Sequence, residues 1–100
     1  MISEFLKIDR EELAALCRRH GILRLALFGS AARGELRPDS DVDVLVEFLP
    51  GTRVGLRFIT VQDELSVLLG RRVDLNTAGF LSRHFRDRVL GEAVPLYEAA

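Results

Sequence analysis

The most constraining feature of the chain is the spacing between Gly29-Ser30 and the pair Asp41 and Asp43. The glycine and serine end a short apolar segment, and the two acidic residues open a second one, which then becomes continuously apolar. Short apolar runs bounded by turn residues are typical of β-strands. Side chains on a strand alternate between its faces, so the two carboxylates share one face, roughly 7 Å apart at Cα. The pattern predicts two strands, with a turn of small residues after the first and two carboxylates at the start of the second.

The remaining segments alternate between helical and strand patterns. Asp9 and Glu12 have the spacing of a capping box, and Gly21 supplies a C-terminal stop, so a helix is predicted between them. Strands separated by helices predict an α/β (α+β) fold, with helices flanking a mixed sheet of three or four strands. The expected elements are helices at 10–20, 30–33 (capped by Ser30), 54–69 and 80–90, strands at 23–28, 41–48 and 71–76, and a docked tail or edge strand at 94–97, where Pro95 excludes a central strand. The apolar stripe expected along the third of these helices is Leu56, Ile59, Leu65, Leu68 and Leu69.

Length and composition indicate one ordinary globular domain over residues 1–100. The chain is 48% hydrophobic and 29% charged, and 100 residues are just enough for a single core. A net charge of −1 gives no general attraction to nucleic acid or to an anionic membrane. No apolar run approaches the ~20 residues that cross a bilayer. Cys17 is the only cysteine, which excludes an intramolecular disulfide and fits a reducing cytoplasm; it lies among apolar helix positions, so we expect no nucleophilic role.

The carboxylates are of the kind that holds magnesium. Mg²⁺ prefers oxygen ligands and is commonly bound by one or two carboxylates together with substrate phosphates. Two such ions can stabilise the attacking and the leaving oxygen of a displacement. A third carboxylate is needed to complete the second metal site or to accept the proton of an attacking hydroxyl. Asp74 is the best candidate because it interrupts an apolar strand, although an ordinary ion pair with Arg71 or Arg72 would also explain it.

The small-residue turn offers the opposite wall of such a site. Glycine at position 29 allows the backbone to approach an oxyanion. A helix that begins at Ser30 would direct its amide groups at phosphates, and the serine hydroxyl can donate a hydrogen bond to them. Arg33 lies about one turn further along and would reach a triphosphate, unless it forms a salt bridge with Glu35 or Asp39.

Taken together, these motifs resemble the signature of the DNA polymerase beta-like nucleotidyltransferase superfamily. Gly29-Ser30 followed after ten residues by Asp41-Val42-Asp43 carries the resemblance. The filling Ala32-Arg33-Gly34 and the strand Val73-Asp74-Leu75 are similar to its minimal nucleotidyltransferase (MNT) branch. The resemblance covers nearly the whole chain. It implies a mixed, polymerase beta palm-like sheet, with ATP or another NTP as donor and Mg²⁺, as two ions, as cofactor.

The same resemblance implies roles for individual residues. Asp41, Asp43 and Asp74 would be the catalytic and metal-binding acids, and Gly29 and Ser30 the phosphate-binding turn. Members of the MNT branch are often antitoxins that attach AMP to a tyrosine of a helical HEPN-domain toxin. This chain has no length left for an acceptor domain, so we expect the acceptor to come from a partner or from a second copy, which leaves a homo-oligomer open.

The expected function is therefore metal-dependent transfer of a nucleoside monophosphate, AMP from ATP, to a protein hydroxyl. Two alternatives remain. The chain can be a non-catalytic antitoxin that neutralises its partner by contact, or a transferase that acts on a small molecule such as an aminoglycoside. The sequence leaves open the preferred nucleotide, the acceptor, the number of nucleotides transferred and the oligomeric state.

Overall fold

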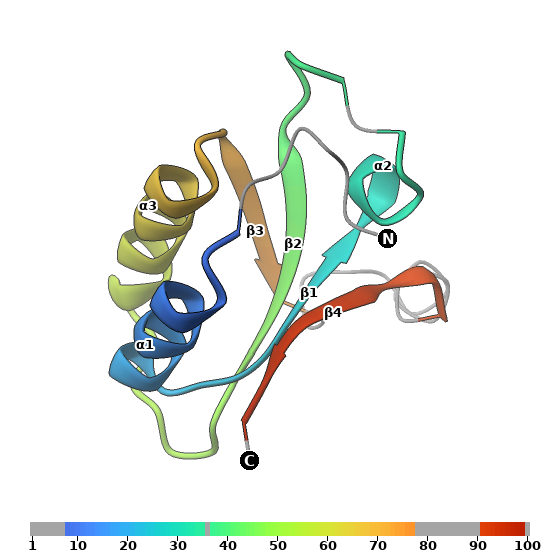
Figure 1. Cartoon of the computed structure of the whole chain (residues 1–100). Coiled ribbons are helices and arrows are strands. Elements are labelled where there is room, and N and C mark those ends of the chain that lie inside the picture. The colour runs from blue at the N-terminus through green and yellow to red at the C-terminus, as the bar shows by residue number, and fades with distance from the viewer. Residues whose placement is uncertain (1–7, 36, 78–90, 100) are drawn as a thin grey trace.

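The chain forms a mixed four-stranded sheet with two longer helices packed side by side against it (Figure 1). The computed structural model describes residues 8–35, 37–77 and 91–99. Strand β1 is antiparallel to both β2 and β4, and β2 is parallel to β3, so the order is β3-β2-β1-β4. This confirms the expected fold class. The described elements are α1 (Arg10–His20), β1 (Ile22–Phe28), α2 (Gly29–Ala32), β2 (Val42–Phe48), α3 (Arg57–Leu69), β3 (Val73–Thr77) and β4 (Val94–Glu98).

Helix α1 has the bounds that its sequence predicts, because both of its ends are capped. Asp9 is the N-cap, and its Oδ1 accepts hydrogen bonds from the amides of Glu11 at 3.0 Å and Glu12 at 3.1 Å. Gly21 ends the helix with φ +67°, and its amide donates to the carbonyl of Arg18 at 3.4 Å.

The core lies between the sheet and the helices α1 and α3. Val42 and Val44 of β2 are completely buried, as the alternation of acidic and apolar residues predicts. Residues from both of these helices, from α2 and from the other three strands complete this layer. Its buried side chains are Leu13, Leu16, Cys17, Ile22, Leu25, Leu27, Ala31, Val42, Val44, Val46, Val61, Leu65, Leu69, Val73, Leu75 and Leu96. The apolar residues of β2 therefore fix which face of that strand its carboxylates occupy.

The predicted apolar stripe of α3 is wrong at its start. Leu56 is 82% exposed and Ile59 is 55% exposed. The helix begins at Arg57, so Leu56 lies outside it as the N-cap. The buried stripe instead recurs every four residues, at Val61, Leu65 and Leu69. Since each residue turns the helix by about 100°, Ile59 lies roughly 200° from Val61 and points outward.

Side chains of α3 accept hydrogen bonds from two backbone amides of β3. Ser66 Oγ accepts a hydrogen bond from the Val73 amide at 3.0 Å and donates one to the carbonyl of Gln62 at 2.9 Å. Gln62 Oε1 accepts from the Leu75 amide at 3.0 Å. Helix α3 thus fixes β3 along the edge of the sheet.

Strand β4 confirms the predicted edge strand. It pairs with β1, at the opposite end of the strand order from β3, and contains Pro95. The helix predicted at 80–90 lies outside the described residues. No helix in the described part of the chain has the length and apolar character to span a membrane.

Candidate functional site

Three neighbouring strands bring the predicted site residues to one end of the sheet. In the pairing of β1 with β2, Phe28 lies opposite Asp43, so Gly29 follows directly beside that carboxylate. In the parallel pairing of β2 with β3, Asp43 lies opposite Asp74. Asp41 immediately precedes β2 and is exposed. Gly29, Asp43 and Asp74, which are far apart in sequence, are therefore neighbours across the sheet.

Asp43 lies directly against the backbone of Gly29. A Cβ placed on Gly29 would be only 2.5 Å from Asp43 Oδ2, which is closer than real Cβ atoms approach other atoms. Gly29 also has φ +63°, in the left-handed region that L side chains rarely adopt. Both observations require glycine here. The sequence suggested that this glycine makes room for an oxyanion, and in the structure it also makes room for the carboxylate.

The electrostatics of the site favour a cation. Burial raises the pKa of the half-buried Asp43 carboxyl, and the negative charges of Asp74 and Asp41 and a hydrogen bond with Asp74 raise it further. Each of these causes disfavours the ionised carboxylate, and a divalent cation beside it would reverse that balance. The donors are all carboxylate oxygens, which suits Mg²⁺.

The acidic residues do not form a closed metal cage. Within residues 8–35, 37–77 and 91–99, no group of three or more His, Cys, Asp or Glu side chains is arranged to hold a metal ion by itself. Mg²⁺ commonly completes its coordination with substrate phosphates and water. The donor set therefore fits an ion that binds together with a nucleotide.

Ser30 is not the N-cap of α2, so this prediction is wrong. The helix begins one residue earlier, at Gly29, and its N-cap is Phe28, which makes no side-chain capping bond. The left-handed conformation of Gly29 turns the chain directly after β1, and the Arg33 amide then donates to the Gly29 carbonyl at 3.3 Å. With only four residues, α2 has little dipole to offer. Phosphate binding at this turn would depend on individual amides and on the Ser30 hydroxyl.

Arg33 makes the salt bridge that was the alternative to phosphate binding. Its Nε lies 2.5 Å from Glu35 Oε1, and its Nη1 lies 3.7 Å from Glu92 Oε2. The hydrogen bond to Glu35 is the largest cause that raises the pKa of Arg33, and the charge of Asp43 also contributes. Arg33 is therefore close enough to Asp43 to interact with its charge, but its nearest partner is Glu35.

Asp74 does not form the ion pair that would have given it a purely structural role. Arg71 donates instead to two backbone carbonyls, those of Arg37 and, at 2.8 Å, Ser40. Among the residues that the structure describes, neither Asp74 nor Arg72 takes part in an ion pair. Asp74 is exposed beside Asp43, so its carboxylate is available to a ligand.

Comparison with known proteins decides the family. Residues 10–96 match the model of the nucleotidyltransferase domain. The chain belongs to the nucleotidyltransferase domain family. It is 39% identical over 95 residues to the protein adenylyltransferase MntA of Thermococcus cleftensis, an alignment that covers 93% of this chain and 90% of that protein.

Solved structures agree with this assignment. A candidate minimal nucleotidyltransferase superposes on this one with a TM-score of 0.74 and 45% identity, over 86% of this chain and 87% of the other. The resemblance to the MNT branch is thereby confirmed. A structure of a tri-AMPylated Shewanella oneidensis HEPN toxin in complex with an MNT antitoxin has a TM-score of 0.62 at 20% identity, over 90% of this chain and 70% of the other. At that identity the likeness shows the shared fold.

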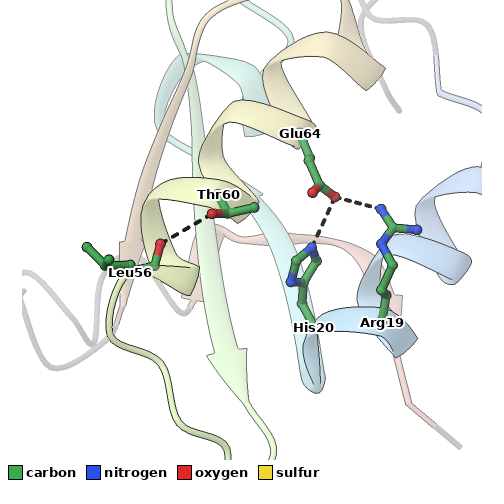
Figure 2. Close-up of polar contacts among 5 residues, drawn as sticks. All are labelled: Arg19, His20, Leu56, Thr60 and Glu64. Carbon is green, nitrogen blue, oxygen red and sulfur yellow. Dashed lines mark hydrogen bonds and ion pairs between the residues drawn. The ribbon is translucent and has the colours of Figure 1, made fainter.

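Another polar cluster of the nucleotidyltransferase lies at the opposite end of β1 from Gly29. His20 Nε2 is 3.0 Å, and Arg19 Nη2 2.6 Å, from the same oxygen of Glu64, which joins the end of α1 to α3 (Figure 2). Figure 2 also shows Thr60 Oγ1 donating to the Leu56 carbonyl, at 3.4 Å, at the start of α3. The contacts of Glu64 with Arg19 and His20 join α1 to α3, whereas the Thr60 bond is local to the start of α3.

Cys17 has no features of a nucleophile. It is completely buried in the core, and burial raises the pKa of its thiol to about 12. A thiol with this pKa carries almost no thiolate near neutral pH.

Sequence reasoning missed two contacts at the site of this nucleotidyltransferase. The packing of Asp43 on Gly29 joins residues of adjacent strands, and the bonds from Arg71 join the end of α3 to the loop before β2. The Asp-Val-Asp pattern predicts the strand face on which Asp43 lies, but it does not indicate which residue packs against that side chain. Neither contact could be predicted from the spacing of neighbouring residues.

Proposed function

We propose that this nucleotidyltransferase transfers AMP from ATP to a hydroxyl of a partner protein in a magnesium-dependent reaction, and that it acts as an antitoxin. The observation that carries the proposal is the position of Asp43, which lies against Gly29 on one side and opposite Asp74 of β3 on the other. Burial and neighbouring negative charge raise the pKa of Asp43, so the site gains from a bound cation. We propose a cytoplasmic location, where ATP is available. A free thiol at Cys17, the one cysteine of the sequence, is consistent with that reducing compartment.

In this proposal Asp74 has two tasks and each other residue of the site has one. Asp41 and Asp43, with Asp74, would hold the magnesium ions. Bound Mg²⁺ would neutralise the triphosphate and stabilise the attacking and leaving oxygens. Asp74 orients the acceptor hydroxyl and takes its proton as the new oxygen–phosphorus bond forms at the α-phosphate. The amides of the turn at Gly29 and the hydroxyl of Ser30 donate to the pyrophosphate, which leaves with the electrons of the broken bond.

We further propose that the acceptor is a tyrosine of a HEPN-domain toxin. The support comes from relatives: MntA of T. cleftensis is named a protein adenylyltransferase, and the S. oneidensis complex holds an AMPylated HEPN toxin with its MNT antitoxin. Asp41 and Asp74 are exposed, so a protein side chain can approach them.

The test is transfer of label from [α-³²P]ATP to the HEPN protein encoded by the neighbouring reading frame, with mass spectrometry to locate the AMP. We expect label on a tyrosine only when Mg²⁺ is present. Asp43→Ala should abolish it, whereas Glu11→Ala, which removes an exposed carboxylate on α1, should leave it unchanged. Equal labelling by Asp43→Ala and wild type would disprove the mechanism.

Co-expression separates catalysis from neutralisation by contact. An antitoxin that works by transfer loses its protection when Asp41 and Asp43 are both replaced by Ala, although it still binds the toxin. A double variant that protects cells as well as wild type would show that contact alone suffices. Label found on an aminoglycoside and not on protein would instead favour a small-molecule acceptor.

A further inference from the structure

We propose that Arg71 is a positioning residue for Asp41, and that it fixes the loop which brings this carboxylate to the site. The inference rests on the proposed function. Arg71 Nη2 donates to the carbonyl of Ser40 at 2.8 Å and to the carbonyl of Arg37. Ser40 is the residue directly before Asp41, so the guanidinium holds the peptide from which Asp41 extends.

The backbone of Arg71 is itself firmly held. Helix α3 ends at Gly70, which has φ +69° and whose amide donates to the Val67 carbonyl at 3.3 Å. The Arg71 amide then donates to the Ser66 carbonyl at 3.1 Å. This pair of bonds closes the helix and directs the next residues toward the sheet. The guanidinium therefore extends from a backbone that is part of the end of α3.

Asp41 is tied on its two sides to two consecutive residues, Arg71 and Arg72. On its N-terminal side, the Ser40 carbonyl accepts from Arg71. On its C-terminal side, the Val42 amide donates to the carbonyl of Arg72 at 2.9 Å. The second bond continues the pairing between β2 and β3, and because it joins two backbone groups, any residue other than proline at position 42 can make it. The first bond needs a long side chain with a terminal donor, and that side chain is Arg71.

Within residues 37–77, the other hydrogen bonds of residues 37–40 are internal to the loop before Asp41. Residues 37–39 are exposed. Within the loop, the Ser40 amide donates to the Arg37 carbonyl at 3.0 Å, and the Arg37 amide donates to Ser40 Oγ at 3.3 Å. These bonds shape the turn but do not attach it to the rest of the protein. Arg71 makes that attachment.

Arginine suits this task better than lysine. A guanidinium NH₂ group has two hydrogens that diverge in one plane, so Nη2 of Arg71 can donate to both carbonyls at once. The ammonium group of lysine has no such fixed plane, and its strong hydration opposes the partly buried position. Arg71→Lys should therefore restore only part of the tether, and Arg71→Met, which keeps an apolar stem, should remove it.

The experiment measures the loop and the ligand separately. In the free protein, amide exchange at Ser40 is followed by NMR. Mg²⁺ titrations then measure the binding of a fluorescent ATP analogue. We expect Arg71→Met to speed amide exchange at Ser40. It should also raise the Mg²⁺ concentration for half-maximal nucleotide binding by about 10- to 100-fold, the range found when partners of metal ligands are removed. Arg71→Lys should lie between Arg71→Met and wild type.

The control is Arg53→Met, which removes an exposed arginine from the loop between β2 and α3 and should match wild type in both measurements. If wild type shows no Mg²⁺-dependent nucleotide binding, the proposed function fails and the role of Arg71 fails with it. If wild type binds and Arg71→Met matches it in exchange and in Mg²⁺ dependence, only the Arg71 proposal is overturned. Arg71→Lys decides the question if Arg71→Met does not fold.

Discussion

The acidic residues of the site are held in two different ways. Asp43 and Asp74 lie within β2 and β3, opposite each other, and their neighbours on each strand are buried in the core. Asp41 lies just outside β2, is exposed, and follows a loop that Arg71 ties to the end of α3. The first pair is therefore positioned by the packing of the whole sheet, and the third residue by a few hydrogen bonds.

This difference has a consequence for how the site responds to change. Displacing Asp43 or Asp74 requires a shift of buried strands, which costs packing free energy. Displacing Asp41 requires only the loss of a polar tether. Substitutions that displace Asp43 or Asp74 should therefore cause a large loss of activity. Substitutions that displace Asp41 should cause a graded loss, which a higher Mg²⁺ concentration should partly restore.

The largest effect is expected from Asp43→Asn. The variant loses a charged ligand at the centre of the site, so the rate of AMP transfer should fall by about 1,000-fold, since charge stabilisation by metal is worth several kcal/mol. The fold should not suffer, because Asn removes repulsion from Asp74 and Asp41. Label transfer and thermal unfolding measure the two quantities. A variant that transfers AMP at the wild-type rate, or one with a clearly lower midpoint of unfolding, would contradict the strand-held description of Asp43.

The next largest effect separates backbone strain from the contact with Asp43. Gly29→Ala introduces a Cβ 2.5 Å from Asp43 Oδ2 at φ +63°, whereas Gly34→Ala introduces one at φ +71° with no atom within 4 Å. Both should lose about 1–2 kcal/mol of stability from the left-handed conformation. Only Gly29→Ala should also displace the carboxylate and slow transfer, by about 100-fold. Equal activity in the two variants would show that the contact does not position Asp43.

The smallest effect is expected from Glu64→Gln, far from the site. The hydrogen bonds from Arg19 and His20 lower the pKa of Glu64 below its ordinary value of 4.5. Its ionised form therefore stabilises the folded state above pH 4.5, and this contribution is lost as the pH falls through the folded-state pKa. Near neutral pH the variant should be less stable by at most about 1 kcal/mol, because the pair is partly exposed.

Urea unfolding at a series of pH values measures this prediction. The difference in free energy of unfolding between Glu64→Gln and wild type should shrink as the pH falls below 4.5. The rate of AMP transfer should be the same in the two proteins. A difference that is independent of pH would mean that the charge of Glu64 does not stabilise the fold. Glu11→Gln, on the exposed face of α1, is the matched control.

The parts of the fold that the sequence predicted are those with local determinants. Helix α1 has an N-cap at Asp9 and a C-terminal glycine, and both ends were predicted to the residue. The alternation of residues in β2 correctly predicted that Val42 and Val44 lie in the core. It thereby also predicted that Asp43 lies on the opposite face of the strand. These features depend on neighbours within a few residues, where propensity and periodicity act.

The features that sequence reasoning missed depend on contacts between distant segments. Ile59 has the spacing of a core residue, but α3 packs with Val61 inward, and only the tertiary arrangement decides between the two faces. Ser30 is a good capping residue, but the left-handed Gly29 starts the turn earlier. The tether from Arg71 joins residues more than thirty positions apart in sequence.

A crystal structure with Mg²⁺ and a non-hydrolysable ATP analogue tests the central claim most directly, since that claim is that the carboxylates beside Gly29 bind the metal and the nucleotide. We expect Mg²⁺ coordinated by Asp41 and Asp43 together with phosphate oxygens, the β- and γ-phosphates at the turn of Gly29 and Ser30, and Asp74 facing the α-phosphate. A nucleotide bound elsewhere on the protein, or Mg²⁺ bound without contact to Asp43, would contradict it.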